Sequence, residues 1–371
     1  MQDKAAIRSR KKNLREEIHC AITPSERTVD NKKMDNHSFE KISIEDLGQA
    51  LVESIVYYGI KYWFVNVGSD WPPFMDAIAK RWAQKNEYPK FIICPHEFTA
   101  TSMAHGYAMV SHDIPLVGYH TTVGTYNALG AIMNAYTARV PLFLLAGGGW
   151  ITKEGLERIA EVPISQESRD QANPLREFIK WDCEIRLKEH IPKVVQRAIQ
   201  ISQTEPKGPV YISIPNDVAL EKATEILLPP RELFVPPSPP QGKPTAIHSA
   251  AKLLVQAKYP LIVTREMGRN PAAVNRLIKL AELLAIPVSG ALGKLGYMNF
   301  PTNHPLSASI PVEEADVVLV IEDHSPWKGE CIPNPQAKYI NLAVDPLYAH
   351  LYSITSHCPA DIFITADPAT A

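Results

Sequence analysis

The 371-residue sequence lacks the features that mark several common classes of protein. Its formal net charge is only -2, with Lys and Arg nearly balanced by Asp and Glu, so no basic excess indicates a nucleic-acid-binding surface. Its longer apolar runs, such as residues 141–147 and 317–321, are far too short to span a bilayer. We therefore expect neither nucleic acid nor a membrane as a partner.

Cysteine is also scarce and scattered. The five cysteines lie far apart and form no C-x-x-C pair, so the sequence gives no sign of a zinc or redox motif. An odd number of scattered thiols suits a reducing compartment. We expect a cytoplasmic protein.

Residues 1–37 contain few large apolar side chains, but nine Lys or Arg and six Asp or Glu. Such a segment cannot bury enough surface to offset its ordering entropy, which predicts a disordered extension. A transit peptide is a less favoured alternative, because Asp3, Glu16 and Glu17 are acidic where such peptides avoid acids. Met34 is an alternative start of the protein.

From residue 38 to residue 225, short β-branched runs alternate with helical stretches. The sequence Ser43-Ile44-Glu45-Asp46 resembles a capping box with Ser43 as the N-cap of the first helix. Strands alternating with crossover helices predict an α/β fold with a mostly parallel, doubly wound sheet. The strands are expected at residues 62–67, 91–94, 116–119, 142–146 and 210–214, and further helices at 74–82, 99–110, 127–136 and 191–202.

A proline-rich connector follows at residues 226–245. Seven prolines lie between Pro229 and Pro244, a density that excludes helix and central strand and predicts a stiff extended linker. The alternation then resumes, which predicts a second α/β domain over residues 246–371. Its strands are expected at residues 261–264, 287–289, 317–321, 339–343 and 362–365, and its helices at 246–256 and 272–284.

Reactive side chains follow three strands of the first domain. Ser69, Glu97 and His120 each lie in the turn after a predicted strand. In parallel sheets, ligands bind outside the carboxyl ends of the strands, so a hydroxyl, a carboxyl and an imidazole are expected at one edge. Each residue also has a purely structural interpretation: Ser69 as a turn residue, Glu97 as a first-turn helix acid, and His120 as a core histidine.

These turns resemble those of the thiamine-diphosphate-dependent enzymes of the acetolactate synthase and benzoylformate decarboxylase type. The segment from His96 to Ala108 is similar to the family's glutamate followed by a helix ending in Gly-Tyr-Ala. The segment from Gly124 to Gly130 resembles its Gly-Thr-x-Asn-x-x-Gly turn, and Val140-Pro141-Leu142 and the strand at 210–214 match further segments. The resemblance implies a thiamine-diphosphate-binding fold followed by a Rossmann-like central domain.

The resemblance also assigns roles to residues. Glu97 would hydrogen-bond the cofactor's aminopyrimidine and share a proton with its ring nitrogen. His120 and Ser69 would face the substrate, an arrangement similar to that of benzoylformate decarboxylase. Together with Glu97, the expected cofactor-binding residues are Thr122, Val123, Gly124 and Asn127.

One family feature is not found in these 371 residues. The family's diphosphate and Mg²⁺ are held by a third domain with a Gly-Asp-Gly turn, and that tripeptide does not occur here. We therefore expect the metal ligands to come from a missing domain or a partner chain. The central domain binds FAD or ADP in some members, but Gly268-Arg269-Asn270 gives weak support for a nucleotide, and Gly147-Gly148-Gly149 is expected to be a flexible crossing.

The resemblance implies a catalytic subunit or fragment of a 2-oxo acid decarboxylase or carboligase, a lyase or transferase. The alternative is a non-catalytic scaffold or regulatory subunit derived from such an enzyme. The expected partners are a 2-oxo acid and either a second copy or a chain carrying the diphosphate-binding domain. Met103 and Tyr107, on the helix after Glu97, are expected to contribute apolar contacts between subunits.

Overall fold

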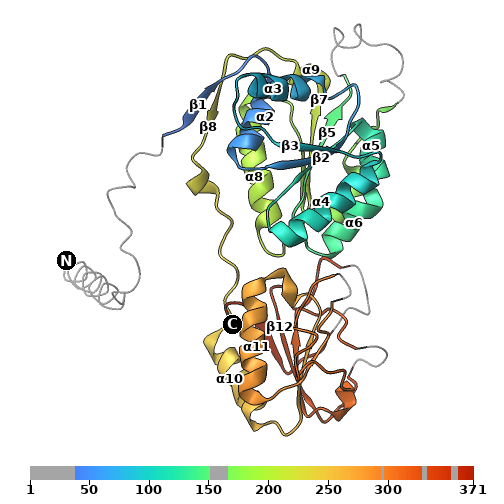
Figure 1. Ribbon diagram of the computed structural model, residues 1–371, viewed down its shortest axis with the longest axis vertical. Coiled ribbons are helices and arrows are strands. Elements are labelled where there is room, and N and C mark those ends of the chain that lie inside the picture. Colours follow the sequence, from blue (N-terminus) through green and yellow to red (C-terminus); the bar gives the residue numbers. More distant parts are fainter. Residues whose placement is uncertain (1–37, 151–165, 294–295, 328–331, 352–357) are drawn as a thin grey trace, which may run out of the picture. The chain divides into compact units, whose positions relative to one another are not determined.

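The computed structural model describes residues 38–150, 166–293, 296–327, 332–351 and 358–371. Within Glu40–Ala371 it contains two parallel sheets, each covered by helices (Figure 1). The predicted α/β class with mostly parallel sheets is confirmed. No helix in the described ranges is long and apolar enough to cross a bilayer.

The first sheet has six strands in the order β3-β2-β4-β5-β7-β6, and every pairing in it is parallel. Its strands are β2 (Tyr62–Asn66), β3 (Lys90–Ile93), β4 (Leu116–Tyr119), β5 (Phe143–Gly148), β6 (Trp181–Glu184) and β7 (Val210–Pro215). One apolar core packs α2 (Leu47–Tyr57), α3 (Pro72–Ala83) and α8 (Ile191–Gln203) against one face. A second core packs α4 (Glu97–Ser111) and α6 (Leu129–Thr137) against the other.

The second sheet has five parallel strands in the order β10-β9-β11-β12-β13. They are β9 (Pro260–Thr264), β10 (Val288–Ser289), β11 (Val317–Ile321), β12 (Lys338–Ala343) and β13 (Ile362–Thr365). The helices α10 (Pro244–Gln256) and α11 (Pro271–Leu284) bury an apolar face against this sheet. Pro244 and Pro271 each open a helix, where the missing N–H of proline costs no hydrogen bond.

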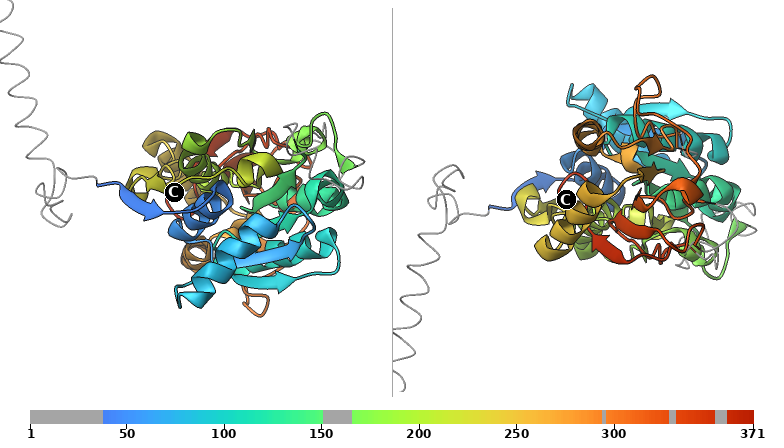
Figure 2. Two further views of the ribbon diagram at one scale, coloured as in Figure 1. Left: turned by 90° about the horizontal axis from the view of Figure 1, so that it is seen from above. Right: turned by 90° about the horizontal axis from the view of Figure 1, so that it is seen from below.

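An antiparallel pair of short strands was not expected from the sequence. β1 (Glu40–Ser43) pairs with β8 (Glu225–Leu228), and β1 lies at the rim of the described part in both views of Figure 2. The predicted boundary between residues 225 and 226 therefore cuts through β8. Between β8 and α10, the proline-rich connector contains a short 3-10 helix, Arg231–Phe234.

Several local predictions need correction. The first helix begins at Leu47 with Asp46 as its N-cap, because the Asp46 carboxylate accepts a hydrogen bond from the Gln49 N–H, whereas Ser43 ends β1. The helix expected over residues 127–136 is two helices, α5 (Thr121–Asn127) and α6, that meet at Ala128. The edge strand β6 was missed. Gly147 and Gly148 are the buried last residues of β5, not a flexible crossing.

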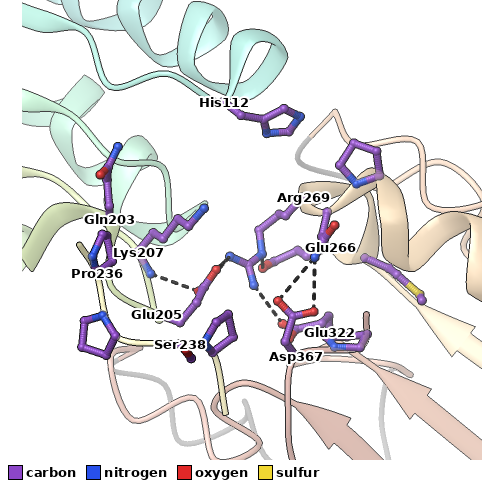
Figure 3. A pocket seen from close by; sticks show the side chains of 16 residues that line it. His112, Gln203, Glu205, Lys207, Pro236, Ser238, Glu266, Arg269, Glu322 and Asp367 are labelled. Carbon is purple, nitrogen blue, oxygen red and sulfur yellow. Dashed lines mark hydrogen bonds and ion pairs between the residues drawn. The ribbon is translucent and has the colours of Figure 1, made fainter. Parts of the chain in front are cut away.

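A buried ion cluster connects the two sheets. Arg139 follows α6, and its Nη2 lies 2.5 Å from carboxylate oxygens of both Glu266 and Glu322. In the opposite direction, Arg269 of the second half lies 3.2 Å from Glu205 of the first half. Figure 3 shows Glu205, Arg269 and Glu322 meeting in the wall of a cavity of about 600 Å³. Each half thus supplies a guanidinium that neutralises carboxylates of the other.

Replacing Arg139 should be strongly destabilising. Arg139→Leu leaves Glu266 and Glu322 buried with only the more distant guanidinium of Arg269, at 4.0 and 3.5 Å, and the free energy of unfolding should fall by about 3–5 kcal/mol. Burial alone would raise the pKa of Glu266, but Arg139, together with a hydrogen bond from His324 and the charge of Arg269, outweighs it and lowers the pKa from 4.5 to about 2. The stabilisation is therefore present above pH 4.5 and is lost as the pH falls toward 2. Urea unfolding at several pH values measures both effects.

The matched control is Arg186→Leu. The Arg186 side chain is 73% exposed where it pairs with Glu184, so its loss should cost less than about 1 kcal/mol. Equal unfolding curves for the two variants would contradict the importance of the buried cluster.

Candidate functional site

The candidate site lies at the carboxyl edge of the first sheet. After β2 the chain adds β3 on one side, and it then returns to place β4 on the other side of β2. Ligands of open parallel sheets bind at such a change of direction. Ser69 and Asp70 follow β2, Glu97 follows β3, and His120 follows β4. The strand order therefore brings these residues to the same edge of the sheet.

Glu97 is the first residue of α4 and is only 6% exposed. Its Oε2 accepts a hydrogen bond of 3.2 Å from Nδ2 of Asn127, at the end of α5. Its Oε1 faces Gly124, where a Cβ would lie 3.0 Å from that oxygen. The His96 ring caps α4 by accepting a hydrogen bond from the Phe98 N–H at 3.1 Å. The structure thus groups Glu97 with the predicted residues Gly124 and Asn127.

Buried hydroxyl groups fix the two helices that begin at the site. In α4, the Thr101 hydroxyl donates to the Glu97 carbonyl oxygen at 2.8 Å and lies 2.7 Å from the hydroxyl of Tyr119. In α5, the Thr125 hydroxyl donates to the Thr121 carbonyl oxygen at 2.7 Å and lies 3.1 Å from the hydroxyl of Tyr211. A tyrosine of the sheet therefore anchors the first turn of each helix.

His120 is bound to a buried carboxylate. Its Nδ1 lies 2.6 Å from Oδ1 of Asp70, which is only 1% exposed. This hydrogen bond raises the pKa of the His120 imidazole, against the opposing effect of burial, and Gln166 and Glu97 also raise it. Gly68 packs against the ring, where a Cβ would lie 2.5 Å from Nδ1. His120 therefore stays protonated to a higher pH than an ordinary histidine.

Three other predicted site residues, Ser69, Thr122 and Val123, make no recorded hydrogen bond to Glu97, Asp70 or His120 among the described residues. Ser69 is exposed in the turn after β2. The Thr122 hydroxyl lies 3.2 Å from the hydroxyl of Ser168, and the Val123 side chain is 43% exposed. The segment expected to be a turn, His120 to Asn127, is mostly the helix α5, because tertiary contacts at its first turn outweigh its weak helix propensity.

Asp70 is the site residue to which sequence reasoning gave no role. It lies in the Gly68-Ser69-Asp70 turn after β2, directly after the predicted site residue Ser69. The sequence does contain one indication of this role. Asp70 directly precedes the large apolar residue Trp71, which is expected to be buried, so the carboxylate is expected to be drawn into the interior with it. An aspartate that is sealed from solvent needs several hydrogen-bond partners. Here the backbone N–H groups of Thr121 and Gly147 donate to it, and Nδ1 of His120 lies 2.6 Å away.

The corresponding edge of the second sheet holds the buried ion cluster, beside the cavity of about 600 Å³. There the chain changes direction between β9 and β11, and Glu266 and Glu322 follow these strands. Arg139 lies between the two carboxylates, and the Gly268 N–H donates to Asn299. A phosphate placed between Glu266 and Glu322 would meet two carboxylates, so these two residues give no support for FAD or ADP at this point.

The described residues contain no group of three His, Cys, Asp or Glu side chains that could hold a metal ion. The residues of the candidate site are instead suited to proton transfer. The Glu97 carboxylate has one oxygen that bonds to no described residue, and the His120 imidazole is paired with a second carboxylate at the same edge of the sheet.

The close approach of Asp70 to Gly147 is testable. A Cβ on Gly147 would lie 2.1 Å from Oδ2 of Asp70, so Gly147→Ala must displace the carboxylate and should lower the free energy of unfolding by about 1–3 kcal/mol. The control is Gly106→Ala in α4, where nothing lies within 4 Å of the new methyl group. That substitution should raise stability by about 0.5–1 kcal/mol. Chemical denaturation measures the free energy of unfolding of both variants. An unchanged free energy of unfolding for Gly147→Ala would contradict the close contact between Asp70 and Gly147.

Comparisons with known proteins show which families this chain is similar to. Residues 45–171 match the family model described as thiamine pyrophosphate enzyme, N-terminal TPP binding domain. The chain is 27% identical over 337 residues to the probable acetolactate synthase large subunit of Methanocaldococcus jannaschii, covering 86% of this chain and 54% of that protein. It is 26% identical over 279 residues to benzoylformate decarboxylase of Pseudomonas aeruginosa, covering 74% and 49% of the two proteins.

A solved structure shows the same fold. It is a putative thiamin diphosphate-dependent enzyme isolated from Mycobacterium smegmatis, with a TM-score of 0.68 and 24% identity over 88% of this chain and 61% of that one. The chain spans about half the length of the curated relatives it matches. The matched domain and the relatives support a relationship of this chain to the superfamily of thiamine-diphosphate-dependent enzymes, whose N-terminal TPP binding domain matches residues 45–171.

Proposed function

We propose that the carboxyl edge of the first sheet is the pyrimidine-binding half of a thiamine-diphosphate site in an enzyme that decarboxylates or ligates 2-oxo acids. The observation that carries this proposal is the state of Glu97. It is a buried carboxylate with one oxygen held by Asn127 and the other facing a glycine.

The surroundings of Glu97 fit an aminopyrimidine ring. No described residue donates a hydrogen bond to Oε1, which leaves this oxygen available to a ring nitrogen. Gly124 keeps the space beside it open, because any Cβ there would crowd the oxygen. The exposed Val123 offers an apolar surface close by, and Thr122 and Asn127 complete the proposed cofactor-binding set. A flat, polar-edged heterocycle matches this combination of groups.

The chain's own residues then divide the proton handling. Bound thiamine diphosphate supplies the nucleophilic carbon and the electron sink that a 2-oxo acid needs to lose its carboxylate. Glu97 would exchange a proton with the ring nitrogen of the pyrimidine. His120, which stays protonated because of Asp70, would donate a proton to the substrate. The exposed Ser69 hydroxyl would orient the substrate's carboxylate.

The diphosphate and Mg²⁺ need ligands from elsewhere. Mg²⁺ prefers carboxylate, carbonyl and phosphate oxygens in octahedral geometry, and no metal-binding cluster is found in the part of the chain that the structure describes. The relatives are about twice as long as the matched region. We propose that polypeptide outside these 371 residues, in the same protein or in a partner chain, supplies these ligands. Glu97 and His120 would then act only in that assembly.

Substitution at the three residues should separate their roles in an assembly that supplies the diphosphate-binding half. Glu97→Gln should slow exchange of the cofactor's C2 proton by about 10²–10⁴-fold before any substrate is added, because an amide cannot share its proton as a carboxyl does. His120→Ala should leave this exchange nearly unchanged and slow carbon dioxide release from benzoylformate or pyruvate. Ser69→Ala should resemble His120→Ala with a smaller loss. Proton NMR in D₂O and a carbon dioxide assay measure the two steps.

The opposite ranking would overturn the assignment. If Glu97→Gln exchanged the proton at the parental rate while His120→Ala did not, Glu97 would not contact the pyrimidine. If all three variants reacted at the parental rates, none of these residues at the sheet edge would take part in the reaction.

A surface beside the site is suited to a second copy of the chain. Four apolar side chains of α4, α5 and α6 are substantially exposed there: Phe98, Met103, Tyr126 and Met133. Phe98 follows Glu97 directly and packs on Gly130, where a Cβ would lie 3.3 Å from its ring. Tyr107, expected to share in this surface, packs inward with its ring centroid 4.7 Å from that of Tyr62. We propose that two copies associate through the four exposed residues.

A charge at this surface should prevent the association. Phe98→Glu places a carboxylate in the proposed apolar contact, so light scattering at micromolar concentration should show a dimer for the parent and a monomer for the variant. Trp82→Glu is the control, because Trp82 is 67% exposed at the end of α3 and lies outside this surface. A monomeric parent, or a dimer that survives Phe98→Glu, would refute the proposed contact.

A further inference from the structure

We propose that Asp70 is the positioning residue for His120, fixing Nδ1 as the nitrogen that always carries a proton and leaving Nε2 as the atom that exchanges a proton with the substrate. The inference rests on the proposed function for its chemical purpose. Its structural content, which nitrogen of His120 titrates, can be measured without cofactor or turnover.

The Asp70 carboxylate is held from three directions. Its Oδ2 accepts hydrogen bonds from the backbone N–H groups of Thr121, at 3.2 Å, and Gly147, at 3.0 Å. Its Oδ1 is 2.6 Å from Nδ1 of His120. Two donors on one oxygen fix the orientation of the carboxylate, and this aims the second oxygen at the imidazole. The absence of a Cβ at Gly147 makes the approach possible.

The chemistry of a carboxylate then determines the tautomer. An ionised carboxylate can only accept hydrogen bonds, so Nδ1 must be the donor in the short contact. Nδ1–H is therefore kept in the neutral and in the charged imidazole, and the charge changes at Nε2. When His120 acts as an acid, the Nε2–H bond breaks, the proton passes to the substrate, and a neutral ring remains with Nδ1–H bonded to Asp70.

Burial separates the two partners of the pair. Asp70 is 1% exposed, whereas the His120 side chain is 21% exposed, so a proton from outside can reach the ring but not the carboxylate. The groups that act on the ring are Asp70, Gln166 and Glu97, and all three favour its protonated form. An asparagine would satisfy the same two backbone donors and fill a similar volume. Packing alone therefore gives no reason for a buried charge at this position.

The test compares the full chain with its Asp70→Asn variant by NMR of ¹⁵N-labelled histidine, and uses His120→Gln to assign the signal. In the parent, His120 should titrate above the ordinary histidine pKa of 6.5, and the neutral form should carry its proton on Nδ1. In Asp70→Asn, the amide N–H donates to Nδ1, so the pKa should fall and the neutral proton should move to Nε2. An unchanged pKa and tautomer in a folded variant would overturn the proposal.

A surface pair provides the matched control. Nε2 of His304 lies 3.3 Å from Oε1 of Glu282, whose side chain is 58% exposed, and Glu282→Gln should leave the His120 signal unchanged. If Asp70→Asn does not fold, the parent protein alone decides, because a neutral His120 with its proton on Nε2 refutes the assignment. Failure of the proposed enzyme activity is a separate outcome, since it would leave the NMR result in place.

Discussion

The architecture of the site depends on one carboxylate that binds three separate segments. Asp70 follows β2, and its oxygens contact the imidazole after β4, the first N–H of α5 and an N–H at the end of β5. Because the carboxylate is sealed from water, each of these donors satisfies a charge that would otherwise be costly to bury. Asp70 therefore sets the start of α5, and with it the position of Gly124 and Asn127 relative to Glu97.

The two helices at the site are held by the same kind of contact. Each has a threonine five residues into the helix that bonds back to its first residue and also meets a buried tyrosine hydroxyl of the sheet. The Tyr211 hydroxyl also accepts a hydrogen bond from the side-chain amide of Gln171. Rigid helix starts are what a site for proton transfer needs, since the transfer depends on short donor–acceptor distances.

Sequence patterns predicted the sheet strands with strong β-branched runs, and placed Glu97 and His120 at strand ends. They failed where the structure depends on distant contacts. β1 and β8 are short strands that pair across about 180 residues, and α5 begins in a segment of Thr and Gly because Asp70 caps it. The sequence marks Asp70 only by its place before Trp71 and Pro72, and it gives no sign for Arg139. The partners of both buried charges lie far away in the sequence.

The ion pairs that Arg139 and Arg269 each form with the other half of the chain limit how readily the two halves could be separated during evolution. A cut in the proline-rich connector would separate Arg139 from Glu266 and Glu322, and Arg269 from Glu205. Glu205 would then lose its guanidinium partner, and Glu266 and Glu322 would keep only the guanidinium of Arg269, at 4.0 and 3.5 Å. The five-stranded half would therefore be less stable as a separate module than it is beside its neighbour. Inheritance together with its neighbour, or apolar residues in place of its two buried glutamates, would avoid this loss.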